Sequence, residues 1–153
     1  MRLSCQKAFI LVVALTAACH ESTSPPAVLR SFVLESVDTQ PVPVVIHASG
    51  GDTTTLYWAS LRMYEGGTAE IAAHSRQVHA TLPTREATDI SHYSYRIIGD
   101  SISFDYSPPC PPYALCVAPP FGKFTSSSTA TLFYYGGVGR QAAYLYRTPY
   151  ALD

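Results

Sequence analysis

The chain has 153 residues, of which 47% are hydrophobic and 14% charged, and its formal net charge is −1. This length suits a single domain, and the composition is not that of a disordered protein, which would be poor in aromatics and strongly charged. Eleven tyrosines and six phenylalanines favour β structure, because aromatic side chains fit the half-buried surface of a sheet.

Residues 1–18 have the pattern of a signal peptide. Arg2 and Lys7 supply positive charge, and an apolar stretch follows over residues 8–18. A spanning helix needs about 20 apolar residues to cross a ~30 Å hydrocarbon core, so this stretch is too short and reads as a secretory signal. No second long apolar run follows, and the sequence predicts no transmembrane span.

Leu15-Thr16-Ala17-Ala18-Cys19 resembles the lipobox of bacterial lipoproteins. The resemblance implies cleavage before Cys19, a diacylglyceryl thioether on its sulfur and acylation of the new amino terminus; the alternative is a plain cleaved signal. Two or more acyl chains hold a protein at a bilayer almost permanently. We therefore expect residues 19–28 to be a flexible tether and the protein to be anchored in the cell envelope. His20 after the cysteine favours the outer membrane, with the domain facing the periplasm or the exterior.

Removal of the signal would leave eight Lys and Arg residues against eleven Asp and Glu, a net charge of −3. That balance argues against a nucleic-acid partner, which would need a basic patch. Once Cys5 leaves with the signal and Cys19 takes the lipid, Cys110 and Cys116 remain as a pair in an oxidising compartment. They predict a disulfide, because the flanking prolines offer no further ligands for a zinc site.

From Leu29 onward, apolar and polar residues alternate with a period of two, and turn residues interrupt the pattern every eight to twelve positions. The first expected strands are residues 29–38, residues 42–48 and residues 50–64, the last beginning with a turn. In the third of these, one face carries Tyr57, Ala59, Leu61 and Met63, and the other carries Trp58, Ser60 and Arg62.

A glycine turn at residues 65–67 leads into a strand over residues 68–75, with Ala69, Ile71 and Ala73 facing inward. Residues 76–88 have a weaker pattern, which fits either a strand that frays at Pro83 or a loop. Residues 91–106 form the clearest hairpin, turning at Gly99-Asp100.

A proline-rich connection over residues 108–120 follows this hairpin, since proline cannot donate to a sheet ladder. Three more strands are expected over residues 122–127, 129–135 and 141–148, and the glycine-rich segment 136–139 joins the last two. No convincing amphipathic helix appears anywhere.

These eight or nine short strands predict an all-β fold, a single antiparallel meander barrel of about eight strands over residues 29–150. Closure into a barrel removes the sheet edges that would otherwise pair with other chains. A β-sandwich is the alternative, because alternation alone does not distinguish one curled sheet from two stacked ones.

The segments FVLESVDTQPVPVVI, YRIIGDSISF, CPPYALC and AYLYR, spread over residues 29–147, resemble a group of small, uncharacterised bacterial lipoproteins with a lipocalin-like barrel. Where that group has a glycine after the first strand, this chain has Thr39. The resemblance implies the fold and carries no functional residue.

Three histidines with acidic residues between them are the only metal-like cluster in the sequence: His74, His79 and His92, with Glu86 and Asp89. Imidazole and carboxylate suit zinc or copper, but the spacing fits no metal pattern, and we expect solvent-exposed histidines and no metal. No G-x-S-x-G elbow is present and no free cysteine remains. Acidic residues near the hairpins, Glu65 with Glu70 or Asp100 with Asp105, would mostly face water. We therefore predict no catalytic residues, no cofactor and no enzyme activity.

Six tyrosines fall on alternating strand positions: Tyr57, Tyr93, Tyr95, Tyr106, Tyr144 and Tyr146. If they face inward, they could line a ligand cavity with apolar walls and hydroxyl groups. The alternative is that they pack tightly and fill the core, since an eight-stranded barrel is wide enough for either outcome. Trp58 and Phe104 would help to plug a filled barrel.

The segment 108–120 offers a second functional surface, because Tyr113 and Leu115 at its tip could anchor a partner. The alternative is that the segment is only a long connection, which the disulfide protects against proteolysis. The sequence thus predicts a lipid-anchored envelope protein that binds a small apolar or amphipathic ligand in its barrel. The alternative is a structural or interaction lipoprotein that has a filled barrel and uses this loop.

Overall fold

The structure is a computed structural model that describes residues 25–135 and 141–149. Within these residues it contains ten strands: β1 (Val28–Val37), β2 (Gln40–Pro41), β3 (Val44–Ser49), β4 (Asp52–Tyr64), β5 (Thr68–Val78), β6 (Arg85–Ile98), β7 (Ser101–Tyr106), β8 (Phe121–Ser126), β9 (Thr129–Tyr135) and β10 (Gln141–Arg147). None of the described residues form a helix with the length and apolar character needed to cross a bilayer. The predicted signal peptide, the lipid site Cys19 and the turn 136–139 lie outside the described residues.

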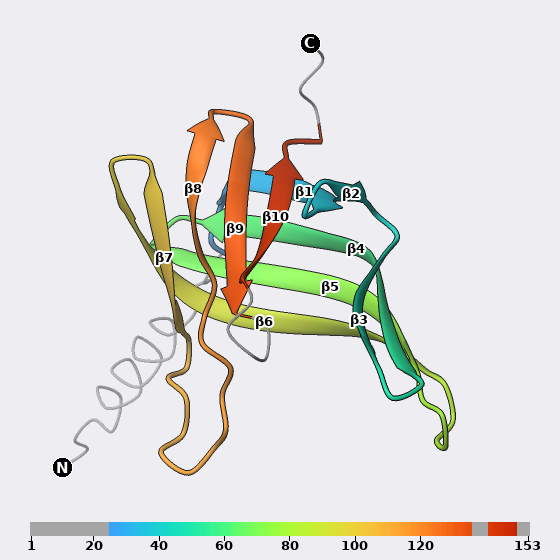
Figure 1. Ribbon diagram of the computed structural model, residues 1–153. Helices are drawn as coiled ribbons and strands as arrows, with labels where there is room; N and C mark the ends of the chain where they lie inside the picture. Colours follow the sequence, from blue (N-terminus) through green and yellow to red (C-terminus); the bar gives the residue numbers. More distant parts are fainter. Residues whose placement is uncertain (1–24, 136–140, 150–153) are drawn as a thin grey trace, which may run out of the picture.

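The strands form a closed barrel (Figure 1). From β4 to β10 each strand pairs antiparallel with the next, and β1 pairs with both β10 and β4, which closes a ring of eight strands. The short β2 pairs with β1, and β3 pairs with the first half of β4. The eight-stranded meander barrel is therefore confirmed and the sandwich alternative is wrong, because a strand that bridges both ends of the meander leaves one continuous sheet.

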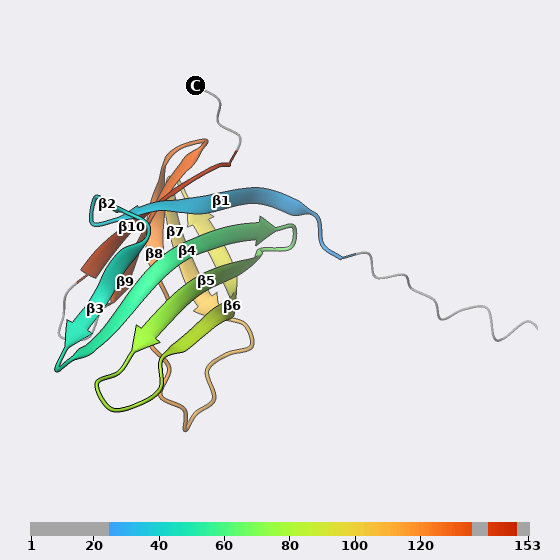
Figure 2. The same cartoon turned by 90° about the vertical axis from the view of Figure 1, so that its right-hand side faces the viewer.

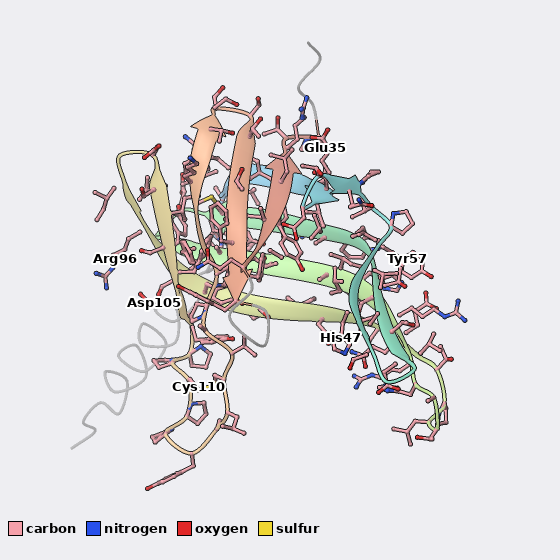
Figure 3. All side chains as sticks on the ribbon, in the orientation of Figure 1. Glu35, His47, Tyr57, Arg96, Asp105 and Cys110 are labelled. Carbon is pink, nitrogen blue, oxygen red and sulfur yellow. A yellow bond between two sulfur atoms is a disulfide. The ribbon has the colours of Figure 1, made fainter. Side chains whose placement is uncertain are left out.

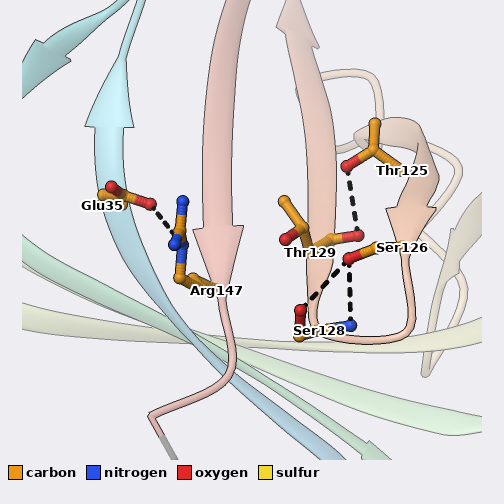
Figure 4. Close-up of polar contacts among 6 residues, drawn as sticks. All are labelled: Glu35, Thr125, Ser126, Ser128, Thr129 and Arg147. Atoms are coloured by element: carbon orange, nitrogen blue, oxygen red, sulfur yellow. Dashed lines mark hydrogen bonds and ion pairs between the residues drawn. The ribbon is translucent and has the colours of Figure 1, made fainter. Parts of the chain in front are cut away.

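The seam between β1 and β10 has an ion pair on its outer surface. Arg147 Nε lies 2.9 Å from Glu35 Oε2 (Figure 4). Both side chains are about half exposed, so this pair contributes at most about 1 kcal/mol. Near it, the β8–β9 turn is held by the Ser126 hydroxyl, which accepts a hydrogen bond from the backbone N–H of Ser128 at 3.2 Å.

Period-two alternation decides which side chains enter the barrel. In β1, Phe32 and Leu34 are buried as predicted, and Ala59, Leu61 and Met63 of β4 are buried on the predicted face. Each fully buried side chain of the size of Leu or Phe contributes about 1.5–3 kcal/mol. The most completely buried large side chains are Tyr146, Phe32, Leu61, Met63, Ile102 and Leu132.

The prediction that Tyr57 shares one face of β4 with Ala59, Leu61 and Met63 is wrong. The register of β4 and β5 shifts between Leu56 and Trp58, so the strand bulges at Tyr57. As a result Leu56 is buried at 3% exposure, while the Tyr57 ring packs beside His74, with 5.8 Å between ring centroids. A bulge places one extra residue on a strand and reverses the alternation on one side of it, and this is why Tyr57 does not share the inner face with Ala59.

The weakly patterned segment 76–88 consists mostly of strand. β5 runs on to Val78, β6 begins at Arg85, and only residues 79–84, which include Pro83, connect them. The first strand of the predicted hairpin thus begins six residues earlier than residue 91. Because β7 ends at Tyr106 opposite Tyr93, the first half of β6 pairs with β5 alone. This leaves one end of the barrel less completely walled.

Candidate functional site

The two ends of the barrel differ in how their strands are connected (Figures 1 and 2). At the closed end the connections are the short turns 65–67, 99–100 and 127–128. There the Phe32 and Phe124 rings lie 6.0 Å apart, and the guanidinium carbon of Arg30 lies 4.5 Å from the Phe124 ring centroid. The other end, which we call the open end, carries the longer connections 79–84 and 107–120.

A cavity of about 170 Å³ lies inside the barrel toward the open end. Aliphatic side chains from β3, β4 and β5 form part of its wall. The rest of the wall consists of tyrosines from three strands and two polar residues of β6: Tyr93, Tyr134, Tyr144, Tyr146, Asp89 and Ser91. The lining is thus apolar over most of its area, with a few hydroxyls and one carboxylate, which is the usual make-up of a small-molecule site.

The tyrosines are arranged as a connected group. The hydroxyls of Tyr134 and Tyr146 lie 3.3 Å apart, within hydrogen-bond distance, and the rings of Tyr134 and Tyr144 have centroids 4.4 Å apart at an angle of 52°. Burial raises the pKa of all three phenols. They therefore stay neutral at physiological pH, and each hydroxyl keeps its capacity both to donate and to accept a hydrogen bond.

The structure brings together three of the six tyrosines that the sequence singled out. Tyr93, Tyr144 and Tyr146 line the cavity, whereas Tyr95 and Tyr106 pack on the core but do not line it. The Tyr95 hydroxyl donates to the carbonyl of Tyr64 at 3.2 Å, and the Tyr106 hydroxyl donates to the carbonyl of Val117 at 2.9 Å. Tyr57 lies outside this group, beside the bulge described above.

Sequence reasoning missed Tyr134, although a usable signal was present. In the expected strand over residues 129–135, Tyr134 has the same parity as Ala130 and Leu132, both fully buried. Extending that alternation by one step would have placed the Tyr134 side chain inside the barrel.

The barrel is neither completely filled nor completely hollow. Phe104, expected as part of a plug, is 4% exposed and belongs to the core, with its ring 5.7 Å from that of Tyr93. Trp58 does not plug anything, because it is 44% exposed and stacks on the His74 ring at 5.7 Å. The closed half is therefore packed, and the hollow is confined to the open half.

Further hollows adjoin the cavity. One of about 420 Å³ shares Ile46 and Tyr144 with it and is also lined by Asp38 and His47; Figure 3 labels His47 near the end where β3 meets β4. A small one of about 60 Å³ shares Asp89 and includes Arg85. A groove of about 390 Å³ shares Tyr93 with the cavity and is bordered by Pro25 and Pro26.

The turn between β1 and β2 borders the larger hollow and has an unusual backbone. Asp38 has φ = 48° and Thr39 has φ = 69°. A β-branched residue rarely adopts this left-handed conformation. The turn is held by Asp38, whose N–H donates to the carbonyl of Ala143 and whose Oδ1 accepts the N–H of Ala143, both at 2.8 Å.

The histidines lie in separate contacts. His74 Nε2 is 3.0 Å from Glu86 Oε1 and its Nδ1 is 3.0 Å from Thr88 Oγ1, whereas His79 Nδ1 is 3.3 Å from Asp52 Oδ2. A hydrogen bond from the backbone N–H of Ala80, together with His79, lowers the pKa of Asp52. Among the described residues, no three His, Cys, Asp or Glu side chains gather in a way that would hold a metal ion.

The predicted disulfide between Cys110 and Cys116 is confirmed, with 6.2 Å between the two Cα atoms. It closes the loop that projects from the open end, where Figure 3 labels Cys110. Tyr113 and Leu115 are fully exposed at its tip, as the sequence predicted. The loop is tied back to the barrel by the Tyr106–Val117 hydrogen bond.

The chain was compared with protein-family models, with curated proteins and with solved structures. No match was found in any of the three comparisons. The candidate function therefore rests on the geometry of this chain and on its sequence.

Proposed function

We propose that this chain is a lipid-anchored protein of the cell envelope that binds a small apolar or amphipathic ligand in the tyrosine-lined cavity. The observation that carries the binding proposal is the tyrosine-lined cavity of about 170 Å³ inside the barrel. The anchoring proposal is supported by the sequence around Cys19, which resembles a lipobox, and by the signal-like segment before it. The resemblance to lipoproteins with a lipocalin-like barrel agrees with the anchoring part and carries no information about a ligand.

The size of the cavity indicates which part of a ligand it would hold. An engineered apolar cavity of about 150 Å³ binds benzene, so this one suits a single ring or a short branched alkyl group. A longer ligand would extend past Tyr144 into the adjoining hollow of about 420 Å³. That hollow is lined by Asp38, Gln40 and His47 in addition to aliphatic side chains, so a polar portion of the ligand would lie there.

A substitution that fills the cavity tests the binding proposal. Ala73→Leu places a larger side chain in the cavity wall, and Ala48→Leu is the matched control at an exposed position of β3 that lines none of the described hollows. Isothermal titration of the full chain with 2-phenylethanol should give saturable binding, which Ala73→Leu weakens at least tenfold and Ala48→Leu leaves unchanged. Binding that survives Ala73→Leu, or no binding by the wild type, would overturn the proposal.

The alternative function is a protein interaction through the disulfide loop, and one observation favours it. Tyr113 and Leu115 are completely exposed, and Val117 is 67% exposed, so the loop presents apolar side chains that touch little of the barrel. Crosslinking in intact cells should capture a partner that Tyr113→Ala/Leu115→Ala loses. Unchanged partners with the double variant would remove the loop from consideration.

The lipid anchor has its own test. Cys19→Ser removes the only sulfur at the expected processing site, so the protein should move from the membrane to the soluble fraction and lose incorporation of labelled palmitate. Cys5→Ser is the matched control, because Cys5 lies inside the expected signal peptide. If Cys19→Ser still sediments with membranes and keeps its electrophoretic mobility, the anchoring proposal fails while the binding proposal stands.

A further inference from the structure

The Asp89 carboxylate and the Tyr144 hydroxyl line the tyrosine cavity and bond no other group in the described part of the chain. The Tyr134 and Tyr146 hydroxyls, in contrast, lie within hydrogen-bond distance of each other. An unpaired polar group that faces an apolar cavity keeps its full capacity for a ligand.

The strand register explains why Asp89 faces the cavity. Asp89 shares its parity in β6 with Ser91 and the buried Tyr93, so all three lie on the inner face. Its cross-strand neighbour is Ala73, whose side chain is too short to fill the space beside the carboxylate. Asp89 remains exposed to solvent at the mouth of the cavity.

An ionised carboxylate only accepts hydrogen bonds, so the ligand group beside Asp89 must donate. The tyrosine rings nearby present electron-rich faces, which attract a cation and not an anion. Asp38, on the other side of Tyr144, adds a second negative charge, and its effect on that phenol contributes to the raised pKa of Tyr144. Among the described residues that line the adjoining hollows, the basic side chains are Arg85, in the small hollow, and His47, in the larger one. Neither of them lines the cavity itself.

We propose that the ligand is a small organic amine, whose ammonium group binds Asp89 and Tyr144 while its ring or short alkyl part packs among Tyr93, Tyr134 and Tyr146. This inference rests on the proposed binding function and specifies its ligand class. The ammonium group would donate to the Asp89 carboxylate and to the free lone pairs of the Tyr144 hydroxyl. No other described residue bonds either group, and the apolar part of the ligand would occupy the hollow volume.

Three probes of similar size and different charge test the inference: phenethylamine, 2-phenylethanol and 3-phenylpropionate. Titrated calorimetrically into the full chain at pH 7, the amine should bind about tenfold more tightly than the alcohol, which corresponds to one added charged contact of about 1.4 kcal/mol. The propionate should bind weakest. Equal affinities for amine and alcohol, or tighter binding of the propionate, would overturn the amine assignment while leaving the cavity as the binding site. If none of the probes binds, the proposed function itself fails.

A pair of matched variants locates the effect. Asp89→Asn removes the charge and keeps the shape, so the preference for amine over alcohol should disappear while alcohol binding persists. Asp105→Asn removes an exposed charge from β7, outside the cavity, and should leave the preference intact. A preference that survives Asp89→Asn would contradict the inference. Near-ultraviolet circular dichroism of both variants would show that the barrel is still folded.

The amine could belong to a free small molecule or to a lipid headgroup, and competition distinguishes these sources. Dihexanoylphosphatidylethanolamine carries the same ammonium group next to a phosphate, which Asp38 and Asp89 would repel. Phenethylamine should therefore remain bound at concentrations of this lipid that match its own. Displacement by the lipid at lower concentration would overturn the small-molecule assignment in favour of a headgroup.

Discussion

The two ends of this barrel are made from the same strands but differ in their interior. At the closed end, tight turns bring β4, β5, β8 and β9 close together, and Phe32, Leu61 and Met63 fill the space completely. At the open end, β6 runs past its partner β7, the connections are long, and small residues such as Ala59, Ala73 and Ser91 face tyrosines across a hollow. The difference teaches that strand alternation selects what faces inward, whereas residue size and the neighbouring strands decide whether the interior is filled.

The largest expected effect compares equal truncations at the two ends. Leu61→Ala, in the packed half, should lower the free energy of unfolding by about 2–5 kcal/mol. Leu56→Ala, at the cavity wall, should lower the free energy of unfolding by about 1 kcal/mol less than Leu61→Ala does, because part of the surroundings of Leu56 is already hollow. Urea denaturation of both variants provides the measurement. Equal losses would mean that the two halves are packed alike.

The second effect concerns the loop at the open end. Cys110→Ser/Cys116→Ser releases a short closed loop and should lower stability by roughly 2 kcal/mol in the chain-entropy model. Because residues 111–117 are exposed and the disulfide no longer constrains them, limited proteolysis should cut residues 107–120 first. If cleavage instead begins at the β8–β9 turn of the closed end, the contrast between the ends is wrong.

A third prediction uses pH to probe the tyrosine group. The pKa values of Tyr134 and Tyr146 are raised above the ordinary value of 10, so the native state favours the neutral phenols. Their contribution to stability is complete below pH 10 and is lost as the pH rises through the folded-state values. Tyr146→Phe should cost about 1 kcal/mol at pH 7, through the lost hydroxyl contact, and should flatten the alkaline fall in melting temperature. A control at the exposed Tyr135, Tyr135→Phe, should leave that fall unchanged.

The smallest effect lies at the strained turn beside the larger hollow. Thr39→Gly removes the steric clash of a β-branched residue at positive φ, which should stabilise the folded state by about 1–2 kcal/mol. Glycine also gives the unfolded chain more conformational freedom, and this offsets part of the gain. A net stabilisation of about 0.5 kcal/mol is expected in thermal unfolding. Thr55→Gly, within β4, should destabilise the protein instead. If Thr39→Gly were destabilising too, the turn would depend on Thr39 for a contact that outweighs its strain.

Several features of the site followed from particular residues in the sequence. The pair Cys110 and Cys116, separated by few residues among prolines, could form only a local loop. Tyr93, Tyr144 and Tyr146 were placed inside by simple alternation. The same rule failed at Tyr57, because a bulge reverses alternation and leaves no signature in a single sequence. Asp89 was read as a neighbour of histidines, and only the extension of β6 back to Arg85 shows that it faces the cavity.

The sequence alone determined that the chain is all-β, that it forms an antiparallel meander, and which residues are bonded by the disulfide. These properties depend on local periodicity and on short separations along the chain. Only the tertiary structure decided that β1 closes the ring against β4 and that a cavity remains toward the open end. It also decided that Gly122 must lack a side chain, because a Cβ there would meet the Thr131 carbonyl and the Leu132 side chain. Those properties depend on contacts between residues far apart in the sequence, and the volume that remains between packed side chains has no counterpart in a linear pattern.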